Sequence, residues 1–408
     1  NHKMDKSNNK LKPAIQHAII AGCIISVISV GFSASFSVFL RPMSVDLGWG
    51  REVFSLSLAI QVLMWGVAQP LAGAYADKHG PTQVLAFGAI FAALGFALRG
   101  ILLDETMFIL TGFIVGIGTG ACSFPVVLVA LSKVVRAKQR SFILGLGTAA
   151  ASAGMFAGAP IATILMDKIG WGAAILIVAA SFLVILPLLY FISRASEKPK
   201  AHKEQLNTLQ AIKIAFSDRS YTLLFFGFFV CGFHVQFIQT HLPAYITDEG
   251  LAPIIGAWSL ALIGLFNIGG SFLSGWSGQL YSKPKLLAGI YASRAAVITI
   301  FIFTPLNETS VLIFSAGMGI LWLSTVALTT GLVAQTQGLK FLSTLVGLVF
   351  LSHQVGGFLG AWLGGRLYDL TGNYNAMWVA AILFGLAATV IHIPIKERPG
   401  KLAQVEAI

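Results

Sequence analysis

Four polar residues with useful chemistry stand inside long apolar stretches of this chain. Arg294 lies in the run Ile-Tyr-Ala-Ser-Arg-Ala-Ala, His353 lies in a glycine-rich run, and His234 and His241 are seven residues apart. A buried guanidinium can hold an anion through two parallel hydrogen bonds. Histidine changes its charge between about pH 5 and 8, so each ring could carry a proton. These residue types predict anion binding at Arg294 and proton coupling at His353, His234 or His241.

The composition places these residues in a membrane. The chain has 408 residues, of which 56% are hydrophobic and only 11% are charged. In a soluble domain about a quarter of the residues are charged. The apolar residues form runs of about 20, enough for a helix to cross about 30 Å of hydrocarbon, and they lack the alternation of barrel strands. An all-α membrane protein with twelve transmembrane helices is expected, at Ala14–Leu40, Val53–Ala74, Val84–Leu103, Met107–Leu131, Phe142–Met166, Gly172–Ile192, Tyr221–Tyr245, Ile254–Leu280, Leu286–Thr304, Ser310–Ala334, Ser343–Leu367 and Asn375–Ile395.

None of the twelve runs contains Asp or Glu. An arginine inside a bilayer costs about 2.5 to 3.5 kcal/mol or more unless it is paired or hydrated. An anionic ligand would supply the missing counter-charge for Arg294. Two other arrangements satisfy it equally well: its guanidinium can bond the carbonyls of a helix end, or it can reach back to the interface. For each histidine, the alternative is a neutral ring in a structural hydrogen bond between helices.

Other polar or aromatic residues inside the runs could line the same cavity, or could instead hold helices together by hydrogen bonds. The full set of candidate substrate-binding residues is Arg294, His353, His234, Gln354, Asn267, Trp322, Ser324, Thr325 and Gln61. The sequence has no recognisable metal-ligand cluster, phosphate-binding loop or nucleophile triad. No cofactor, metal or enzymatic activity is therefore expected.

The second half of the chain repeats the first. Gly154 and Gly158 in the fifth run recur as Gly356 and Gly360 in the eleventh, at an offset of 202 residues. Pairs at an offset of 201 or 202 also include Gly31 and Gly232, Phe36 and Phe237, Pro42 and Pro243, and Asp167 and Asp369. Two pseudo-symmetric six-helix bundles are expected, at residues 14–193 and 219–396, joined by a cytoplasmic, solvated linker at residues 194–218.

The distribution of Lys and Arg predicts the orientation. Positive residues in short loops favour the cytoplasmic side, and with both termini inside, 21 of the 27 Lys and Arg residues lie there. Those expected outside are Arg41, Arg51, Arg99, Lys168 and Arg366. Topology thus explains the net charge of +11, and no nucleic-acid partner is expected.

A short polar break follows the second run. Gly73, Asp77, Lys78 and Gly80 fit the pattern G-x-x-x-D-(R/K)-x-G, which resembles the loop between helices 2 and 3 of the major facilitator superfamily. Asp77 could accept from amides at a nearby helix start, where the helix dipole favours a carboxylate. The loop would then act as a gating latch between the bundles; the alternative is an ordinary turn. Because Gln279 replaces the acid in the second repeat, such a latch is expected in the first half only.

Longer stretches resemble one branch of that superfamily. The runs Gly48-Trp-Gly-Arg51 and His353-Gln-Val-Gly-Gly-Phe-Leu-Gly are similar to those of bacterial monocarboxylate porters, including oxalate:formate antiporters. The resemblance implies a substrate site near the midplane, between the two repeats. Asn267 and Ser271 stand where eukaryotic-type porters carry an acid and an arginine, so that carboxylate anchor is not expected here.

The branch resemblance implies a secondary transporter that moves a small organic anion by alternating access. It would be a proton symporter or an anion exchanger. It is expected as a monomer in the bacterial inner membrane, with lipid, its substrate and protons or a counter-anion as its only partners. Two alternatives stay open. The apolar interior without carboxylates also favours an exporter of amphipathic compounds or a metallophore, and the other alternative is a membrane receptor or structural protein that transports nothing.

Overall fold

The structure is a computed structural model that describes residues 12–101, 104–123, 125–127, 130–131, 137–195, 208–338 and 341–406. Within these ranges the side chains of residues 77–78, 137–145, 208, 343, 401 and 405–406 are left out. All regular secondary structure in the described part is helical. We refer to the residues up to 195 as the first half and to those from 208 as the second half.

Twelve helical spans of the described residues are long and apolar enough to cross a membrane, as the sequence predicts. In the first half the elements are α1 (Pro13–Ser35), the 3₁₀ helix η2 (Phe36–Phe39), α2 (Leu40–Leu47), α3 (Arg51–His79), α4 (Pro81–Ile101), α5 (Glu105–Ala121), α7 (Ala137–Ile169), α8 (Trp171–Leu183) and α9 (Ile185–Ala195). In the second half they are α10 (Thr208–Phe216), α11 (Arg219–Asp248), α12 (Pro253–Leu280), α13 (Lys283–Phe303), α14 (Glu308–Leu321), α15 (Ser324–Gln337), α16 (Leu342–Thr371), α17 (Asn375–His392) and α18 (Lys401–Glu406).

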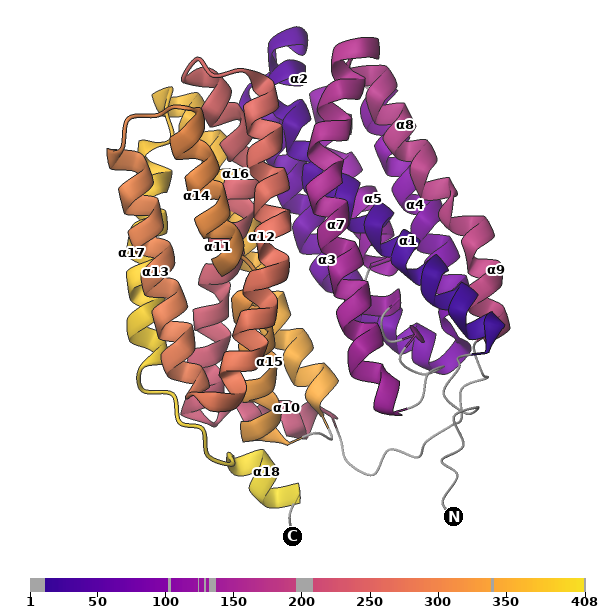
Figure 1. The fold of residues 1–408 in the computed structure, drawn as a ribbon, viewed down its shortest axis with the longest axis vertical. Helices are drawn as coiled ribbons and strands as arrows, with labels where there is room; N and C mark the ends of the chain where they lie inside the picture. Colours follow the sequence, from indigo (N-terminus) through magenta and orange to yellow (C-terminus); the bar gives the residue numbers. More distant parts are fainter. Residues whose placement is uncertain are drawn as a thin grey trace, which may run out of the picture.

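The two halves stand side by side as two bundles, and α18, the last helix, lies at the lower edge of Figure 1. We call this lower edge the terminal end and the opposite edge, where α2 lies, the distal end. Large apolar side chains cover the outer surface; Phe272 and Phe303, for example, are mostly exposed. A lipid environment accounts for such a surface, because water would penalise it.

Three helices differ from the sequence-based expectation. The first span passes through the 3₁₀ turn η2 and continues past Leu40 in α2, which ends at Leu47. The tenth is broken at Trp322 and Leu323, between α14 and α15. The expected linker is only partly described, since residues 196–207 lie outside the described ranges, but its last part forms α10, whose Ala211 and Ala215 are buried. This part of the linker is therefore a packed helix and not a solvated segment. The expected domain bounds stay a prediction.

Glycines hold the repeated helices together by direct backbone contact. A Cβ added at Gly154 of α7 would strike the carbonyl of Val27 in α1, and one added at Gly356 of α16 would strike the carbonyl of Phe229 in α11. The two contacts correspond residue by residue: Gly356 lies 202 positions after Gly154, and Phe229 lies 202 positions after Val27. Close backbone approach at small residues replaces the hydrophobic drive that is absent in lipid. The sequence repeat is thus a repeat of contacts as well.

Replacing Gly356 by Ala should destabilise the protein, because the new methyl group would press on the Phe229 main chain. Overpacking of this kind costs about 1–3 kcal/mol. We expect Gly356→Ala to melt at a lower temperature than the unsubstituted protein in detergent, measured by tryptophan fluorescence. Gly269→Ala in α12 is the control, since the space around its Cβ is open, and it should melt no lower than the unsubstituted protein. Equal melting temperatures of the two variants would contradict the contact.

Candidate functional site

Arg294 lies in the core of the second half and is 0% exposed. Its Nε and Nη2 donate to the Leu321 carbonyl at 3.1 and 2.6 Å, and Nη2 also donates to the Trp322 carbonyl. These are the orphan carbonyls at the end of α14, which cannot be satisfied within the helix. Of the arrangements open from the sequence, bonding to a helix end is therefore the one adopted. Nη1 has no hydrogen-bond partner among the described residues, so one donor is left over.

Asn267 of α12 holds the other side of the same break. Its Oδ1 accepts from the Leu323 amide, the orphan donor before α15, at 3.1 Å and from Ser271 Oγ at 3.2 Å. Its Nδ2 lies 3.5 Å from Ser152 Oγ of α7 in the first half. The break in the tenth span is thus satisfied by two side chains, and one of them also reaches across the interface between the halves.

Three further candidates surround the break without facing the first half. Trp322, Ser324 and Thr325 are all buried. Ser324 Oγ donates to the carbonyl of Ile320 in the preceding turn, and Thr325 Oγ1 lies 3.2 Å from Cys231 Sγ of α11. The hydroxyls of Ser324 and Thr325 therefore have partners inside the second half, and among the described contacts they stabilise the broken helix.

His353 and Gln354 form a link between the halves. Gln354 Nε2 donates to the Val62 carbonyl of α3 at 3.1 Å, which leaves Oε1 to accept from His353 Nδ1 at 2.8 Å. Nδ1 of His353 therefore carries a proton. Its Nε2 is buried and has no partner among the described residues, while the ring packs 4.9 Å from that of Phe228. This histidine can accept a proton without losing an existing bond.

The first half contains a buried arginine that the sequence reading assigned wrongly. Arg99 was expected in an external loop, but it lies in α4 and is 0% exposed. Its Nη1 donates to Gln61 Oε1 at 2.7 Å, its Nε to Thr111 Oγ1 at 3.1 Å and its Nη2 to Ser57 Oγ at 2.9 Å, with Phe36 4.8 Å away. Its position within the apolar run was the available signal. The side-chain carbonyl of Gln61, a candidate substrate-binding residue, thus accepts from Arg99.

The interior is positively charged in both halves. Among the residues that the structure describes, no Asp or Glu side chain is buried. The described hydrogen-bond partners of Arg99 and Arg294 are carbonyls, hydroxyls and one amide, and the two guanidinium groups also lie over the rings of Phe36 and Tyr291. Such neutral dipoles satisfy the donors but leave the net charge, so the interior favours anions.

Two candidate histidines lie within the second half. His234 is fully buried, and its Nε2 is 2.6 Å from the Ala381 carbonyl of α17. His241 is also buried, with Nε2 2.7 Å from the Ala361 carbonyl of α16 and Nδ1 3.1 Å from Tyr374 Oη. Both therefore join helices of one bundle, and the described contacts of His241 continue toward the distal end.

At the distal end one half caps a helix of the other. α3 follows Gly50, which has no side chain to satisfy the first amides of the helix. Asp369 of α16 does so instead: Oδ1 accepts from the Arg51 amide at 2.9 Å and Oδ2 from the Glu52 amide at 2.8 Å. The helix dipole favours a carboxylate at this position. Separation of the halves would leave these amides without their acceptor.

Charged side chains strengthen the same contact. Arg51 Nη2 donates to Asp248 Oδ1 at 2.6 Å, and Nη1 lies 2.5 Å from Oδ2. Glu52 pairs with Arg366 at 3.2 Å and accepts from Trp362 Nε1 at 2.9 Å. The two-pronged pair is the strong member, because Arg51 is buried and its geometry is bidentate. We define the distal latch as Arg51, Glu52, Asp248, Asp369 and Tyr374.

The loop expected to latch the terminal end is only partly described. Gly80 has φ +92°, a conformation that favours glycine, and the space around Gly73 is open. The side chains of Asp77 and Lys78 lie outside the described part of the chain. Their gating role stays a prediction. The distal latch, in contrast, was not expected from the sequence, although Arg51 belongs to one of the runs that carry the family resemblance.

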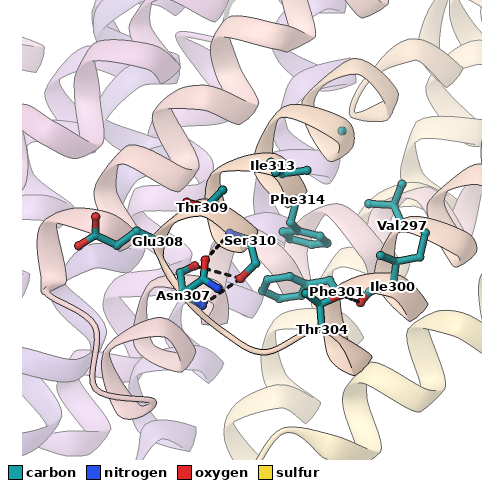
Figure 2. Close-up of a pocket in the computed structure, with 11 residues that line it drawn as sticks. Val297, Ile300, Phe301, Thr304, Asn307, Glu308, Thr309, Ser310, Ile313 and Phe314 are labelled. Atoms are coloured by element: carbon teal, nitrogen blue, oxygen red, sulfur yellow. Dashed lines mark hydrogen bonds between the residues drawn. The ribbon is translucent and has the colours of Figure 1, made fainter.

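A cavity of about 820 Å³ lies away from all of these residues, between α13 and α14 (Figure 2). Phe301 and Phe314 stack at 4.0 Å in its wall, and the mostly exposed Ile300 and Ile313 open it to the outer surface. This apolar pocket faces the lipid side of the second half. It contributes nothing to the polar site between the halves.

Comparison with known proteins places the chain in a family. A family model described as Major Facilitator Superfamily matches residues 22–339. The uncharacterized MFS-type transporter YcxA of Bacillus subtilis strain 168 is 24% identical over 90% of this chain and 92% of its own, and Monocarboxylate transporter 13 of Rattus norvegicus is 26% identical over 94% and 87%. A bacterial homologue of the human lysosomal transporter Spinster, solved inward-facing and occupied, shares the fold with a TM-score of 0.73 at 13% identity, over 94% of this chain and 97% of that one. The chain belongs to the Major Facilitator Superfamily and is a membrane transporter, not an enzyme.

Proposed function

We propose that this transporter moves a small organic anion, of the monocarboxylate class, by alternating access. The observation that carries the proposal is the buried positive charge of Arg99 and Arg294, with no buried Asp or Glu among the described residues. A cation in a bilayer needs an opposite charge or water, and a transported carboxylate can supply it. The printed name of the rat relative, a monocarboxylate transporter, supports the same substrate class.

The two arginines have different roles in this proposal. Arg99 donates with all three of its nitrogens to neutral side chains, so it raises the potential without contacting the substrate. Arg294 keeps Nη1 without a described partner and can add Nη2 by releasing the Trp322 carbonyl. It then offers two parallel donors to a carboxylate. The anion approaches between the halves, at the level where Asn267 and Gln354 bridge them.

His353 is the coupling residue of the proposed cycle. Its bare Nε2 accepts the proton, and the imidazolium then stands beside the Gln354 amide that bonds Val62 of the other half. The added charge attracts the anion and changes the electrostatic environment of the Gln354 bond to Val62, which joins the halves. Symport of a proton with the anion follows from this arrangement, and anion exchange is the same cycle without proton release.

The cellular setting completes the proposal. We propose that both termini face the cytoplasm, which the excess of Lys and Arg on the terminal side supports. We further propose that the protein acts as a monomer in a bacterial inner membrane. The distal latch then closes the external side in the described conformation. In the proposed cycle this is the state in which the anion exchanges with the cytoplasm.

Arg294→Gln should reduce anion transport, because the glutamine amide carries no charge and cannot offer two parallel N–H donors to a carboxylate. Loss of a charged hydrogen bond of about 1.5–3 kcal/mol corresponds to a fall of about ten- to a hundredfold. The measurement is counterflow of short radiolabelled monocarboxylates in liposomes, with melting temperatures to verify folding. Arg294→Lys, which keeps the charge, should retain part of the rate.

The control for this experiment is Arg194→Gln in α9, whose guanidinium lies at the surface over Tyr190, and it should transport normally. A folded Arg294→Gln variant with an unchanged rate would make the anion site wrong. Counterflow of amphipathic cations, and of no anion, would favour the exporter instead.

His353→Gln should separate coupling from exchange. The Gln side chain keeps a polar group beside Gln354 but cannot accept a proton near neutral pH. We expect accumulation driven by a pH gradient to be lost, whereas exchange of anion against anion continues. The control is His392→Gln in α17, a buried histidine bonded to the Ala388 carbonyl within its own helix. His392→Gln should keep gradient-driven accumulation, and persistence of that accumulation in His353→Gln would refute the assignment of His353.

A further inference from the structure

The hydrogen bonds of His241 define its protonation state in the closed distal latch. Nε2 is 2.7 Å from the Ala361 carbonyl, which can only accept, so the proton is on Nε2. Nδ1 then carries a lone pair and accepts from the hydroxyl of Tyr374 at 3.1 Å. The oxygen of Tyr374 in turn accepts from Arg51 Nη1 at 2.9 Å. The latch is therefore built on a neutral imidazole.

A second proton on His241 disrupts this chain of bonds. Nδ1 becomes a donor, and Tyr374 Oη then faces two donors, one from the imidazolium and one from Arg51. Its own hydrogen loses its acceptor. Two positive charges also come to share one neutral oxygen in a buried site, where repulsion is only weakly screened. Arg51 is the residue that binds Asp248, so the strain falls on the contact between the halves.

We propose that His241 is a proton switch for the distal latch: the neutral ring holds the latch closed, and protonation releases it. The proposal rests on the proposed function only in assuming that the distal end opens during the transport cycle. It differs from the role of His353, which couples the proton to the substrate. If the distal side is external, an acidic exterior opens the carrier toward the side from which protons enter.

The other charged groups near His241 favour the neutral ring in the closed state. Asp248 of α11 is already paired with Arg51 and with Arg41 of α2, at 3.3 Å. Asp369 of α16 is bonded to two amides of α3 and is not free to accept from the ring. The titratable and charged groups around the switch are Asp248 and Tyr245 on α11, Arg41 on α2, Arg51 and Glu52 on α3, Arg366, Tyr368 and Asp369 on α16, and Tyr374 before α17.

His234 provides a matched comparison on the same helix. It lies seven residues before His241, is equally buried and also approaches a carbonyl through Nε2. Its Nδ1, however, has no partner among the described residues. His234 therefore lacks the link to Arg51 that makes the latch sensitive to the charge of His241. A generic effect of protonating a buried histidine in α11 would act at either position.

The experiment measures the distal separation directly. Spin labels are placed at Val45 of α2 and Leu370 of α16, which are 71% and 69% exposed, after Cys23, Cys122 and Cys231 are replaced by Ser or Ala. Pulsed electron-spin distances are recorded on the full chain in lipid nanodiscs, without substrate, from pH 8 to pH 5. The background without the native cysteines must keep its melting temperature before it is used.

The closed distance should dominate at pH 8 and give way to a longer one as the pH falls. A switch that takes up one proton changes the open-to-closed ratio by up to about tenfold per pH unit. His241→Gln can donate to Ala361 and accept from Tyr374, so it should remain closed throughout. His234→Gln should respond like the unsubstituted protein. Tyr374→Phe, which breaks the link and leaves His241, should lose the pH response as well.

The proposal is overturned if the unsubstituted protein shows one distance from pH 8 to pH 5, or if His241→Gln opens with the same midpoint. Should His241→Gln not fold, an unchanged pH response in Tyr374→Phe overturns it equally. These distances need no substrate. Failure of the anion proposal therefore appears as an unchanged counterflow rate in Arg294→Gln. Failure of the switch appears as a distance between the spin labels that does not change with pH.

Discussion

The absence of water inside the bilayer determines how this transporter is built. Every backbone group that a helix leaves unpaired must find a partner within the protein. The break in the tenth span shows the consequence: Arg294 satisfies the carbonyls that end α14, and Asn267 satisfies the amide before α15. A charged residue is thus tolerated in the core because it solves a hydrogen-bonding problem there. The same residue keeps Nη1 without a described partner, and this is the donor that we propose for the anion.

The distal latch applies the same constraint between the two bundles. Gly50 cannot cap α3, so the cap comes from Asp369 of the opposite half. When the halves part, the first amides of α3 and the charge of Arg51 lose their partners together. Helix capping of this kind is worth about 1 kcal/mol in water, and buried charged bonds are worth more. Contacts of this type have two discrete arrangements, made or broken, which is what a carrier with two conformations requires.

The features predicted from the sequence are those that depend on local pattern. The twelve spans follow from runs of apolar residues, and the paired bundles follow from glycines such as Gly154 and Gly356 at a constant offset. The latch could not be predicted in this way, because Arg51 meets residues 197 to 323 positions away. Arg99 was misplaced because a count of positive residues treats an arginine near a helix end as a loop residue. Its neutral partners, Ser57, Gln61 and Thr111, lie on two other helices.

The chemistry of the two halves differs although their scaffolds repeat. In the first half all three guanidinium nitrogens of Arg99 have partners, and the contacts of this half with the second include the Val62 carbonyl and the Ser152 hydroxyl, which are neutral acceptors. The second half carries the broken helix, the unpaired Nη1 of Arg294 and the three buried histidines of the sequence analysis. The two bundles therefore share one framework, because equivalent helices pack by the same backbone contacts in each bundle. The residues that we propose to bind the anion and the proton, Arg294 and His353, both belong to the second half. The distal latch needs residues of both halves, so a substitution at Asp248 or Asp369 would alter the contacts between the bundles as well.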